Sequence, residues 1–336
     1  MLKVFLTHTP HALENYYGAR ALEALRKIVD VQINETGRVM DTQDLIGQTP
    51  GNDILVVDRN TPLDVNFFEN CTGVMAVHRG AVDHRNVDVE AASKNGILVT
   101  NANPGFVDSV TELIIGMMID LGRSVSSYVV QFHAENPPIP HLGHQLAGST
   151  LGIIGYGSIG KRLSEVAAVL GMKILVHDPY ITITDEHIHQ VSFLDVLAGA
   201  DFLACLAVAT DETENLMNEA AFSAMKQSSY FINVSRGNLV DEAALEVALN
   251  IGHLAGAALD VGRAPDQMPT PSLAAHPNVI ATPHIGGQTP QSAEFQALET
   301  VEQVRALTEG EMPHNALNPE EARLVRAYLQ EFTRSS

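Results

Sequence analysis

The chain has 336 residues, 45% of them hydrophobic, which is the composition of a globular protein and at typical domain sizes predicts two domains. Its formal net charge of -20 argues against binding to nucleic acid or anionic membranes, and it contains no apolar run long enough for a membrane span. Two distant cysteines, Cys71 and Cys205, form no disulfide framework and are expected to be buried free thiols. Without a signal-peptide pattern at the N-terminus, these features predict a cytoplasmic protein.

Short β-rich runs alternate with helical patterns through the first hundred residues. Apolar residues at helical spacing over Ala12–Ile28 separate the first two runs. This alternation predicts a parallel sheet with helices on both faces. The predicted strands are Leu2–Thr7, Val29–Ile33, Asp53–Asp58, Val74–His78 and Ile97–Thr100.

A second alternating series begins at Gly148, after a polar stretch rich in Pro, Gly and His at Glu135–Gly148. Two such series in one chain predict two α/β domains rather than one large sheet. The predicted strands are Thr150–Ile154, Lys173–His177, Phe202–Leu206, Tyr230–Val234, Ala257–Val261 and Asn278–Thr282. The predicted helices are Ser158–Leu170, Glu219–Met225, Asp241–Asn250 and, at the C-terminus, Pro319–Phe332.

A glycine motif, G-x-G-x-x-G, lies between the first strand and the first helix of the second series. Its glycines are Gly155, Gly157 and Gly160. In a dinucleotide site the first permits a tight turn, the second lets the backbone approach a pyrophosphate, and the third lets helix and strand pack closely. The N–H groups at the start of the helix supply donors and partial positive charge to the phosphates.

A carboxylate, Asp178, follows the next strand about 20 residues later, where it accepts hydrogen bonds from a ribose. It repels a 2′-phosphate, so NAD is favoured over NADP as the cofactor. The alternative is a turn residue, because Asp178-Pro179 is also a common turn pair. Strand, glycines, helix, strand and acid together predict a dinucleotide-binding domain.

Three further strand ends in the second series carry polar side chains. Arg236, Asp260 and His284 each follow a predicted strand and so lie at its carboxyl end, where ligands bind in open α/β sheets. Arginine binds a carboxylate with two parallel hydrogen bonds, and histidine exchanges a proton near neutral pH. That pairing suits interconversion of an alcohol and a carbonyl beside a carboxylate.

These segments resemble the D-isomer-specific 2-hydroxyacid dehydrogenase family, which includes phosphoglycerate dehydrogenase, hydroxypyruvate reductase and D-lactate dehydrogenase. The resemblance also covers the segments Arg79–Asp88, Gly96–Asn101 and Ser109–Glu112. It implies that Arg236 binds the substrate carboxylate and that His284 is the acid/base. It also implies NAD as cofactor, with contacts from Gly155, Gly157, Ser158, Ile159, Gly160, Asp178, Val234, Ser235, Arg236, Asp260, His284 and Gly287. No metal site is predicted.

One departure from the family pattern lies beside the histidine. The family has a glutamate, followed by proline, that pairs with the histidine, but this chain has Pro265 at the glutamate's place and Asp266 one residue later. Three alternatives remain open: the Asp266 carboxylate reaches His284 as a catalytic partner, Gln267 pairs with a neutral ring, or His284 has no such partner. Arg263 in the same segment either adds a second cation for the substrate or faces solvent.

The resemblance also places Arg79 and Gly80 in a substrate-binding loop, although a surface role for Arg79 is an equal alternative. The predicted fold is two Rossmann-like, doubly wound parallel-sheet domains with a cleft between them. Residues 1–101 and 288–336 form the substrate domain, and 102–287 the NAD domain. The apolar side of a helix near Asp108, from Val110 to Val130, is either a homodimer surface or a core helix.

The predicted function is hydride transfer between NAD and a small D-2-hydroxy/2-oxo acid. The intact Arg236 and His284 favour this enzyme. The alternative from another class is an NAD-sensing binding protein, similar to the C-terminal binding protein corepressors, which Pro265 favours modestly.

Overall fold

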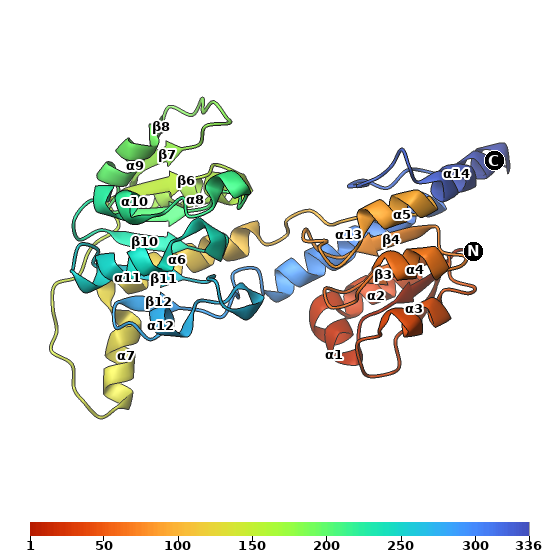
Figure 1. The fold of residues 1–336 in the computed structure, drawn as a ribbon, viewed down its shortest axis with the longest axis horizontal. Helices are drawn as coiled ribbons and strands as arrows, with labels where there is room; N and C mark the ends of the chain where they lie inside the picture. Colours follow the sequence, from red (N-terminus) through yellow and green to blue (C-terminus); the bar gives the residue numbers. More distant parts are fainter. Residues whose placement is uncertain (336) are drawn as a thin grey trace. The chain divides into compact units, whose positions relative to one another are not determined.

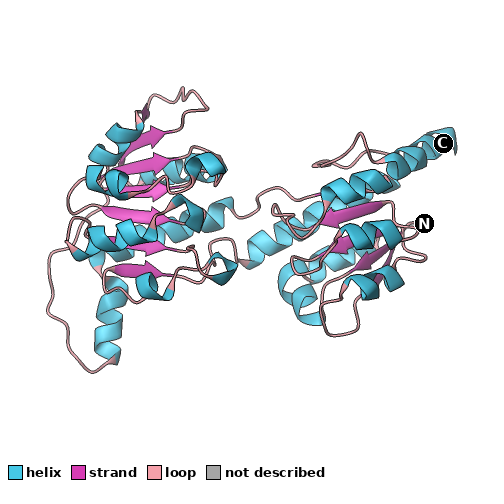
Figure 2. Ribbon diagram, in the orientation of Figure 1, coloured by secondary structure: helices cyan, strands magenta, loops and turns pink. Residues whose placement is uncertain are grey.

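The structure, a computed structural model, describes residues 1–335 and consists of two compact units. Unit 1 contains Met1–Gly105 and the segment that begins at Gln288, and unit 2 contains Phe106–Gly287. Each unit has one parallel sheet flanked by helices (Figure 1), and Figure 2 shows how regularly strands and helices alternate. The predicted fold class, two Rossmann-like α/β domains, is confirmed.

Unit 1 has a five-stranded sheet in the order β2-β1-β3-β4-β5, with all neighbours parallel. Alternate residues of its strands enter two separate cores, so that Val4 and Leu6 face one layer of helices and Phe5 faces the other. This two-sided burial explains why the central strand β3 is wholly apolar, whereas the edge strand β2 carries exposed polar residues. The strands are β1 Lys3–Leu6, β2 Asp30–Ile33, β3 Ile54–Val57, β4 Ala76–Arg79 and β5 Leu98–Thr100, all close to the predicted runs.

The single helix predicted over Ala12–Ile28 is wrong. Gly18, with φ of 83°, breaks the run into a π-helical turn, η1 (Leu13–Tyr17), and α2 (Ala19–Arg26). The long helix α13 (Pro290–Thr308) packs against both pieces. The other helices of unit 1 are α1 Pro10–Ala12, α3 Thr42–Gln48, α4 Val65–Asn70, α5 Val89–Asn95 and α14 Arg323–Ser335, the last confirming the predicted C-terminal helix.

Unit 2 has a seven-stranded parallel sheet in the order β12-β11-β10-β9-β6-β7-β8. Successive strands are added towards one edge of the sheet from β6 to β8 and towards the other edge from β9 to β12. In doubly wound folds ligands bind at this switch point, between β6 and β9. Six of its strands were predicted, and the short edge strand β8 was not. The strands are β6 Thr150–Ile154, β7 Lys173–His177, β8 Ile188–Gln190, β9 Phe202–Cys205, β10 Tyr230–Asn233, β11 Gly256–Leu259 and β12 Val279–Ala281.

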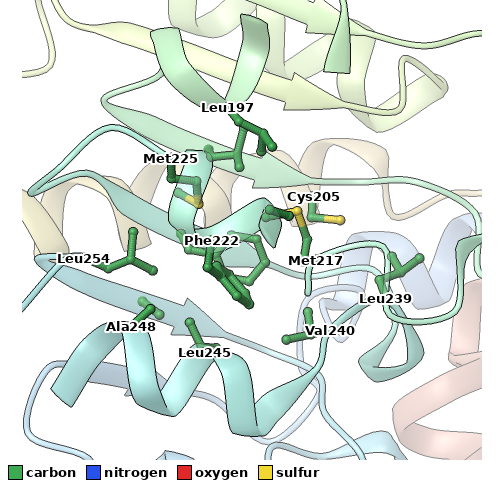
Figure 3. Packing of buried hydrophobic residues seen from close by; sticks show 14 of the residues in the cluster. Leu197, Cys205, Met217, Phe222, Met225, Leu239, Val240, Leu245, Ala248 and Leu254 are labelled. Carbon is green, nitrogen blue, oxygen red and sulfur yellow. The ribbon is translucent and has the colours of Figure 1, made fainter. Parts of the chain in front are cut away.

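Two buried cores lie on opposite faces of this sheet. Figure 3 shows one of them, in which Phe222 packs among Leu197, Met217 and Leu245. Cys205 is fully buried there, as expected, whereas Cys71 of unit 1 is only half-buried. The helices are α8 Ser158–Val169, α9 Phe193–Gly199, α10 Glu219–Ala224, α11 Glu242–Asn250 and α12 Pro271–Ala274, with short turns η2 Asp211–Thr213, η3 Gly237–Leu239 and η4 Pro265–Gln267.

The predicted long apolar helix after Asp108 is two helices, α6 (Val107–Arg123) and α7 (Val125–His133). Ser124, with φ of 56°, separates them. One side of α6 is buried in the core of unit 2, and α7 has no buried residue. Among the described residues no single helix has the length and apolar character of a membrane span. Only α6 and α7 taken together have that length and apolar character, and they are bent by 67° relative to each other.

Candidate functional site

The three glycines after β6 have three different environments. At Gly155 φ is 93°, and an added Cβ would lie 2.7 Å from the Ala207 backbone nitrogen. At Gly160 it would lie 2.5 Å from the Gly155 carbonyl oxygen. At Gly157, by contrast, no described atom lies within 4 Å of an added Cβ. Packing within the protein therefore requires the first and third glycines, while the second leaves open space beside the backbone.

That open space adjoins the N-terminus of α8. Gly157 is the N-cap residue, no side chain caps the helix, and its first turn contains no acidic residue. Ser158 is exposed and Ile159 is half-buried at this end. Backbone N–H groups at a helix start bind anions, so the loop fits the pyrophosphate of a dinucleotide.

Asp178, directly after β7, accepts two backbone hydrogen bonds. Its Oδ2 accepts from Tyr156 N at 2.8 Å, and its Oδ1 accepts from Tyr180 N at 2.9 Å. The first bond ties the glycine loop to the end of β7, and the second makes the predicted turn. A carboxylate has about four acceptor sites, so Asp178 retains capacity for ribose hydroxyls.

Arg236 begins a loop that is fixed to two strand ends. The Ser235 hydroxyl donates to the Ala207 carbonyl oxygen at 2.8 Å, and Asn233 Nδ2 donates to the Arg236 carbonyl oxygen at 2.9 Å. The half-buried Arg236 donates from its guanidinium to the Ser235 carbonyl oxygen at 2.7 Å. Val234 packs into the core beneath, so its side chain supports the loop from below.

Asp260, at the end of β11, is a buried carboxylate that organises the neighbouring strand end. It accepts hydrogen bonds from Thr282 Oγ1 at 2.6 Å and from the backbone N–H groups of Ile285 and Gly286, both at 2.8 Å. Its carbonyl oxygen accepts from His284 N at 2.9 Å. Asp260 therefore fixes the backbone on both sides of His284, a role that the sequence analysis did not foresee.

His284 itself has φ of 54°, the left-handed region that L residues rarely adopt. Its ring Nδ1 lies 3.0 Å from the main-chain carbonyl oxygen of Asp266. Because a carbonyl only accepts, Nδ1 carries the hydrogen, and Nε2 is the basic nitrogen of the neutral ring. Position 266 therefore supplies a partner for the ring through its backbone, whereas the sequence analysis considered only its carboxylate.

The segment that presents this carbonyl is itself strained. Asp266 and Gln267 have φ of 57° and 58°, two consecutive left-handed residues. The Gln267 side-chain oxygen is buried without a hydrogen-bond partner among the described residues, so it does not pair with the imidazole. Pro265 thus opens a turn that directs the Asp266 backbone oxygen at the ring.

Arg263 is exposed, which confirms the second alternative considered for it, and its guanidinium is also held by neighbouring groups. Its guanidinium pairs with Glu214 at 2.8 Å and donates to Asn215 Oδ1 at 2.6 Å. It also donates to the carbonyl oxygens of Val240 and Asn238, at 3.1 and 3.0 Å. Arg263 therefore links the loops on either side of η3, and its hydrogen bonds and ion pair stabilise their arrangement.

Unit 2 brings most of the predicted site together at one edge of its sheet. The glycine loop, Arg236, Asp260 and His284 follow β6, β10, β11 and β12, and the last three strands are neighbours. Gly287 ends the same loop as His284. Arg79 and Gly80 belong to unit 1, at the end of β4, where Arg79 Nε donates to Asn86 Oδ1 at 3.2 Å.

Known proteins resemble this chain over most of its length. It is 34% identical to the D-3-phosphoglycerate dehydrogenase of Bacillus subtilis over 79% of this chain and 51% of that protein. It is 29% identical to the hydroxypyruvate reductase of Thermotoga maritima over 81% of this chain and 90% of that protein. The D-lactate dehydrogenase of Aquifex aeolicus, solved with NAD and lactic acid, has a TM-score of 0.73 and 26% identity over 94% of this chain and 99% of that one.

The chain spans between 49% and 61% of the length of the phosphoglycerate dehydrogenases that it matches. Residues 115–286, about half of the chain, match the family described as D-isomer specific 2-hydroxyacid dehydrogenase, NAD binding domain. That range falls inside unit 2 and contains its whole sheet and glycine loop. The chain therefore belongs to the D-isomer-specific 2-hydroxyacid dehydrogenase family, with its NAD-binding domain in unit 2.

Proposed function

We propose that this protein is an NAD-dependent oxidoreductase that interconverts a small D-2-hydroxy acid and the corresponding 2-oxo acid. The observation that carries the proposal is the arrangement at three neighbouring strand ends of unit 2. Arg236 follows β10, Asp260 follows β11, and His284 follows β12 with its ring oriented by the Asp266 carbonyl. An arginine and a histidine with a defined basic nitrogen are the groups that a 2-oxo acid needs.

The glycine loop and the ends of β7 and β10 are the proposed cofactor contacts. Gly157, Ser158 and Ile159 bind the pyrophosphate, where the backbone is open and the helix start lacks a cap. Asp178 binds the adenine ribose. Ser235, Arg236, His284 and Gly287 line the nicotinamide pocket, which Val234 and Asp260 support. Bound nicotinamide supplies the hydride to the substrate or takes it up.

The chain's own residues position the acid and move the proton. Arg236 binds the carboxylate and polarises the neighbouring oxygen. In reduction the protonated ring of His284 donates from Nε2 to the developing alkoxide, and in oxidation Nε2 accepts the hydroxyl proton. Unit 1 is the proposed substrate domain, with Arg79 and Gly80 as contacts.

The cytoplasmic location stays a prediction from the sequence.

A second candidate function is NAD(H) sensing with little or no turnover. The observation that favours it is that Pro265 stands at the place of the family glutamate and that the ring of His284 contacts the neutral main-chain carbonyl of the next residue, Asp266. A full negative charge stabilises an imidazolium more strongly than a carbonyl dipole does. A sensor would bind NADH tightly and turn over every acid slowly.

A homodimer is proposed through the exposed apolar side of α6 and α7. Ile119, Val129, Val130 and Phe132 are 44%, 45%, 67% and 64% exposed there, although α6 buries its opposite side. Clustered exposed apolar residues mark interaction surfaces. Sedimentation of a Val130→Asp variant tests the proposal, because a charge in this patch is expected to yield monomers.

Oxidation of NADH by a panel of 2-oxo acids tests the proposed activity. The panel contains glyoxylate, hydroxypyruvate, pyruvate, oxaloacetate and phenylpyruvate, with NADPH in parallel. We expect turnover of at least one acid with NADH, and loss of about 100-fold or more in kcat for His284→Asn. Full activity in that variant rules out the acid/base assignment. Tight NADH binding without turnover of any acid supports the sensing function.

A further inference from the structure

The chain leaves unit 1 through a short segment that lies along α13. This crossing segment, Asn101–Gly105, follows β5 and has no helix or strand of its own, and unit 2 begins at the next residue. The chain returns to unit 1 at Gln288, and α13 begins two residues later, at Pro290. A regular helix and an irregular segment therefore meet where the chain enters and leaves unit 1.

Two polar side chains of α13, four residues apart, bind alternate residues of the crossing segment. Gln303 Nε2 donates to the Asn101 carbonyl oxygen at 2.7 Å. Glu299 Oε2 accepts from Asn103 Nδ2 at 2.8 Å and from Asn103 N at 3.2 Å. Gln303 is fully buried and the Glu299 side chain is 17% exposed, so both side chains are largely shielded from water.

The contacts continue one helical turn further towards the start of α13. Phe295 precedes Glu299 by four residues, and a Cβ added at Gly105 would overlap the Phe295 ring. Four residues of helix rise about 6 Å, a distance that two residues of irregular chain can span. Residues 295, 299 and 303 of the helix therefore meet residues 105, 103 and 101 of the segment in register, and these three pairs form the seam of unit 1.

The crossing segment in turn holds the loop after β4. Ala102 N donates to the Ala81 carbonyl oxygen at 3.1 Å, and Asn101 Nδ2 donates to the Val82 carbonyl oxygen at 2.9 Å. The proposed substrate contact Gly80 directly precedes these two residues of the loop. The seam therefore supports the loop that contains this contact.

The crossing segment depends on side chains for its order. Backbone hydrogen bonds fix the conformation of a helix or strand, whereas an irregular segment is fixed by whatever pairs with its polar groups. The charge of Glu299 strengthens the hydrogen bonds that it accepts, and its Oε2 also lies 3.1 Å from His314 Nε2. At Gln303 both halves of the amide are used, since its donor faces a carbonyl oxygen and its acceptor faces the Thr100 hydroxyl.

We propose that Glu299 and Gln303 are positioning residues for the reaction. They hold the crossing segment on α13, and through Asn101 and Ala102 they set the position of the loop that contains Gly80. Both act through the segment and not by touching substrate or cofactor. The effect on turnover rests on the proposed function, whereas the effect of Glu299 on the order of the segment does not.

Amide hydrogen exchange of the full chain, without substrate, tests the seam directly. Glu299→Ala is expected to raise the exchange rates of the Asn103 and Ala102 amides at least about tenfold, because the first loses its acceptor and the second its support. Glu302→Ala removes the same charge from the exposed side of the same helix and is expected to change both rates by less than about twofold. Unchanged exchange of the Ala102 amide in Glu299→Ala overturns the proposal.

Two comparisons separate positioning from folding. Exchange of the Leu55 amide, in the central strand β3, reports the stability of unit 1 as a whole. An equal acceleration at Leu55 and Ala102 in Glu299→Ala shows a general loss of stability and contradicts the proposal. Asn103→Ala breaks the same contact from the exposed segment, where folding is less affected, and is also expected to accelerate exchange at Ala102.

Kinetics test the effect on turnover. In Glu299→Ala, the KM for a 2-oxo acid is expected to rise about tenfold, while kcat falls by less than about threefold. The Kd of NADH is expected to change by less than about twofold, since the cofactor binds unit 2. Glu299→Gln keeps an acceptor oxygen for Asn103, so its KM is expected within about threefold of wild type.

The outcomes distinguish the seam from the proposed function. An unchanged KM in Glu299→Ala, together with faster exchange at Ala102, means that the seam is purely structural and overturns the positioning role. If wild type turns over no acid at all, the proposed function fails, while amide exchange still decides whether Glu299 orders the crossing segment.

Discussion

Buried histidine makes the stability of unit 1 depend on pH. His78 of β4 is fully buried, and its Nδ1 lies 2.7 Å from Thr100 Oγ1. The Thr100 hydroxyl donates to Gln303 Oε1 at 2.7 Å, so it accepts from His78, and Nδ1 carries the hydrogen. Nε2 is buried without a partner among the described residues. A proton added there has no acceptor.

Burial therefore lowers the pKa of His78 from 6.5 to about 3. Between these values the unfolded chain binds a proton that the folded chain does not, so stability falls as pH falls below 6.5. At pH 5 the folded ring is still neutral, whereas the unfolded ring is protonated. Because pH 5 lies about 1.5 units below the unfolded pKa, protonation stabilises the unfolded chain by about 2 kcal/mol, at about 1.4 kcal/mol per unit. Above pH 7 the effect vanishes.

Amide hydrogen exchange of β4 peptides at several urea concentrations measures this free energy in unit 1 alone, which a two-domain chain requires. His78→Asn keeps a donor towards Thr100 and removes the titration. We expect its loss of stability between pH 7 and pH 5 to be about 2 kcal/mol smaller than that of wild type. His11→Asn, at an exposed histidine, is the matched control. Equal pH dependence in His78→Asn and wild type refutes the reasoning.

Three predictions concern unit 2. In Gly157→Ala the added Cβ has no described atom within 4 Å, so this variant is expected to change stability by less than about 1 kcal/mol while raising the Kd of NADH at least about tenfold. In Gly160→Ala the added Cβ lies 2.5 Å from a backbone oxygen, so this variant is expected to lower the melting temperature instead. Asp260→Asn replaces an acceptor with a donor facing loop N–H groups, and urea unfolding is expected to show a loss of about 2 kcal/mol, with a lower kcat. Asp266→Val is expected to have a kcat/KM about tenfold below that of Asp266→Gly, since both lose the carboxylate but only valine opposes a φ of 57°; equal values would show that the turn does not position His284.

The sequence by itself determined eleven of the twelve described strands and the nucleotide loop, and it missed only the short edge strand β8. Strands buried on both faces are apolar runs, and the period and length of those runs locate them to within a residue or two. The glycine motif is equally local, because a positive φ at Gly155 and close packing at Gly160 depend on nearby chain. Breaks at Gly18 and Ser124 were missed, because the apolar spacing continues across both.

Tertiary structure alone decided how the polar side chains are used. One partner of His284 is a main-chain oxygen, which every residue type possesses, so no residue pattern signals it. Likewise, Asp260 looks like a ligand contact in sequence, and only the three donors that converge on it reveal that it holds the histidine loop.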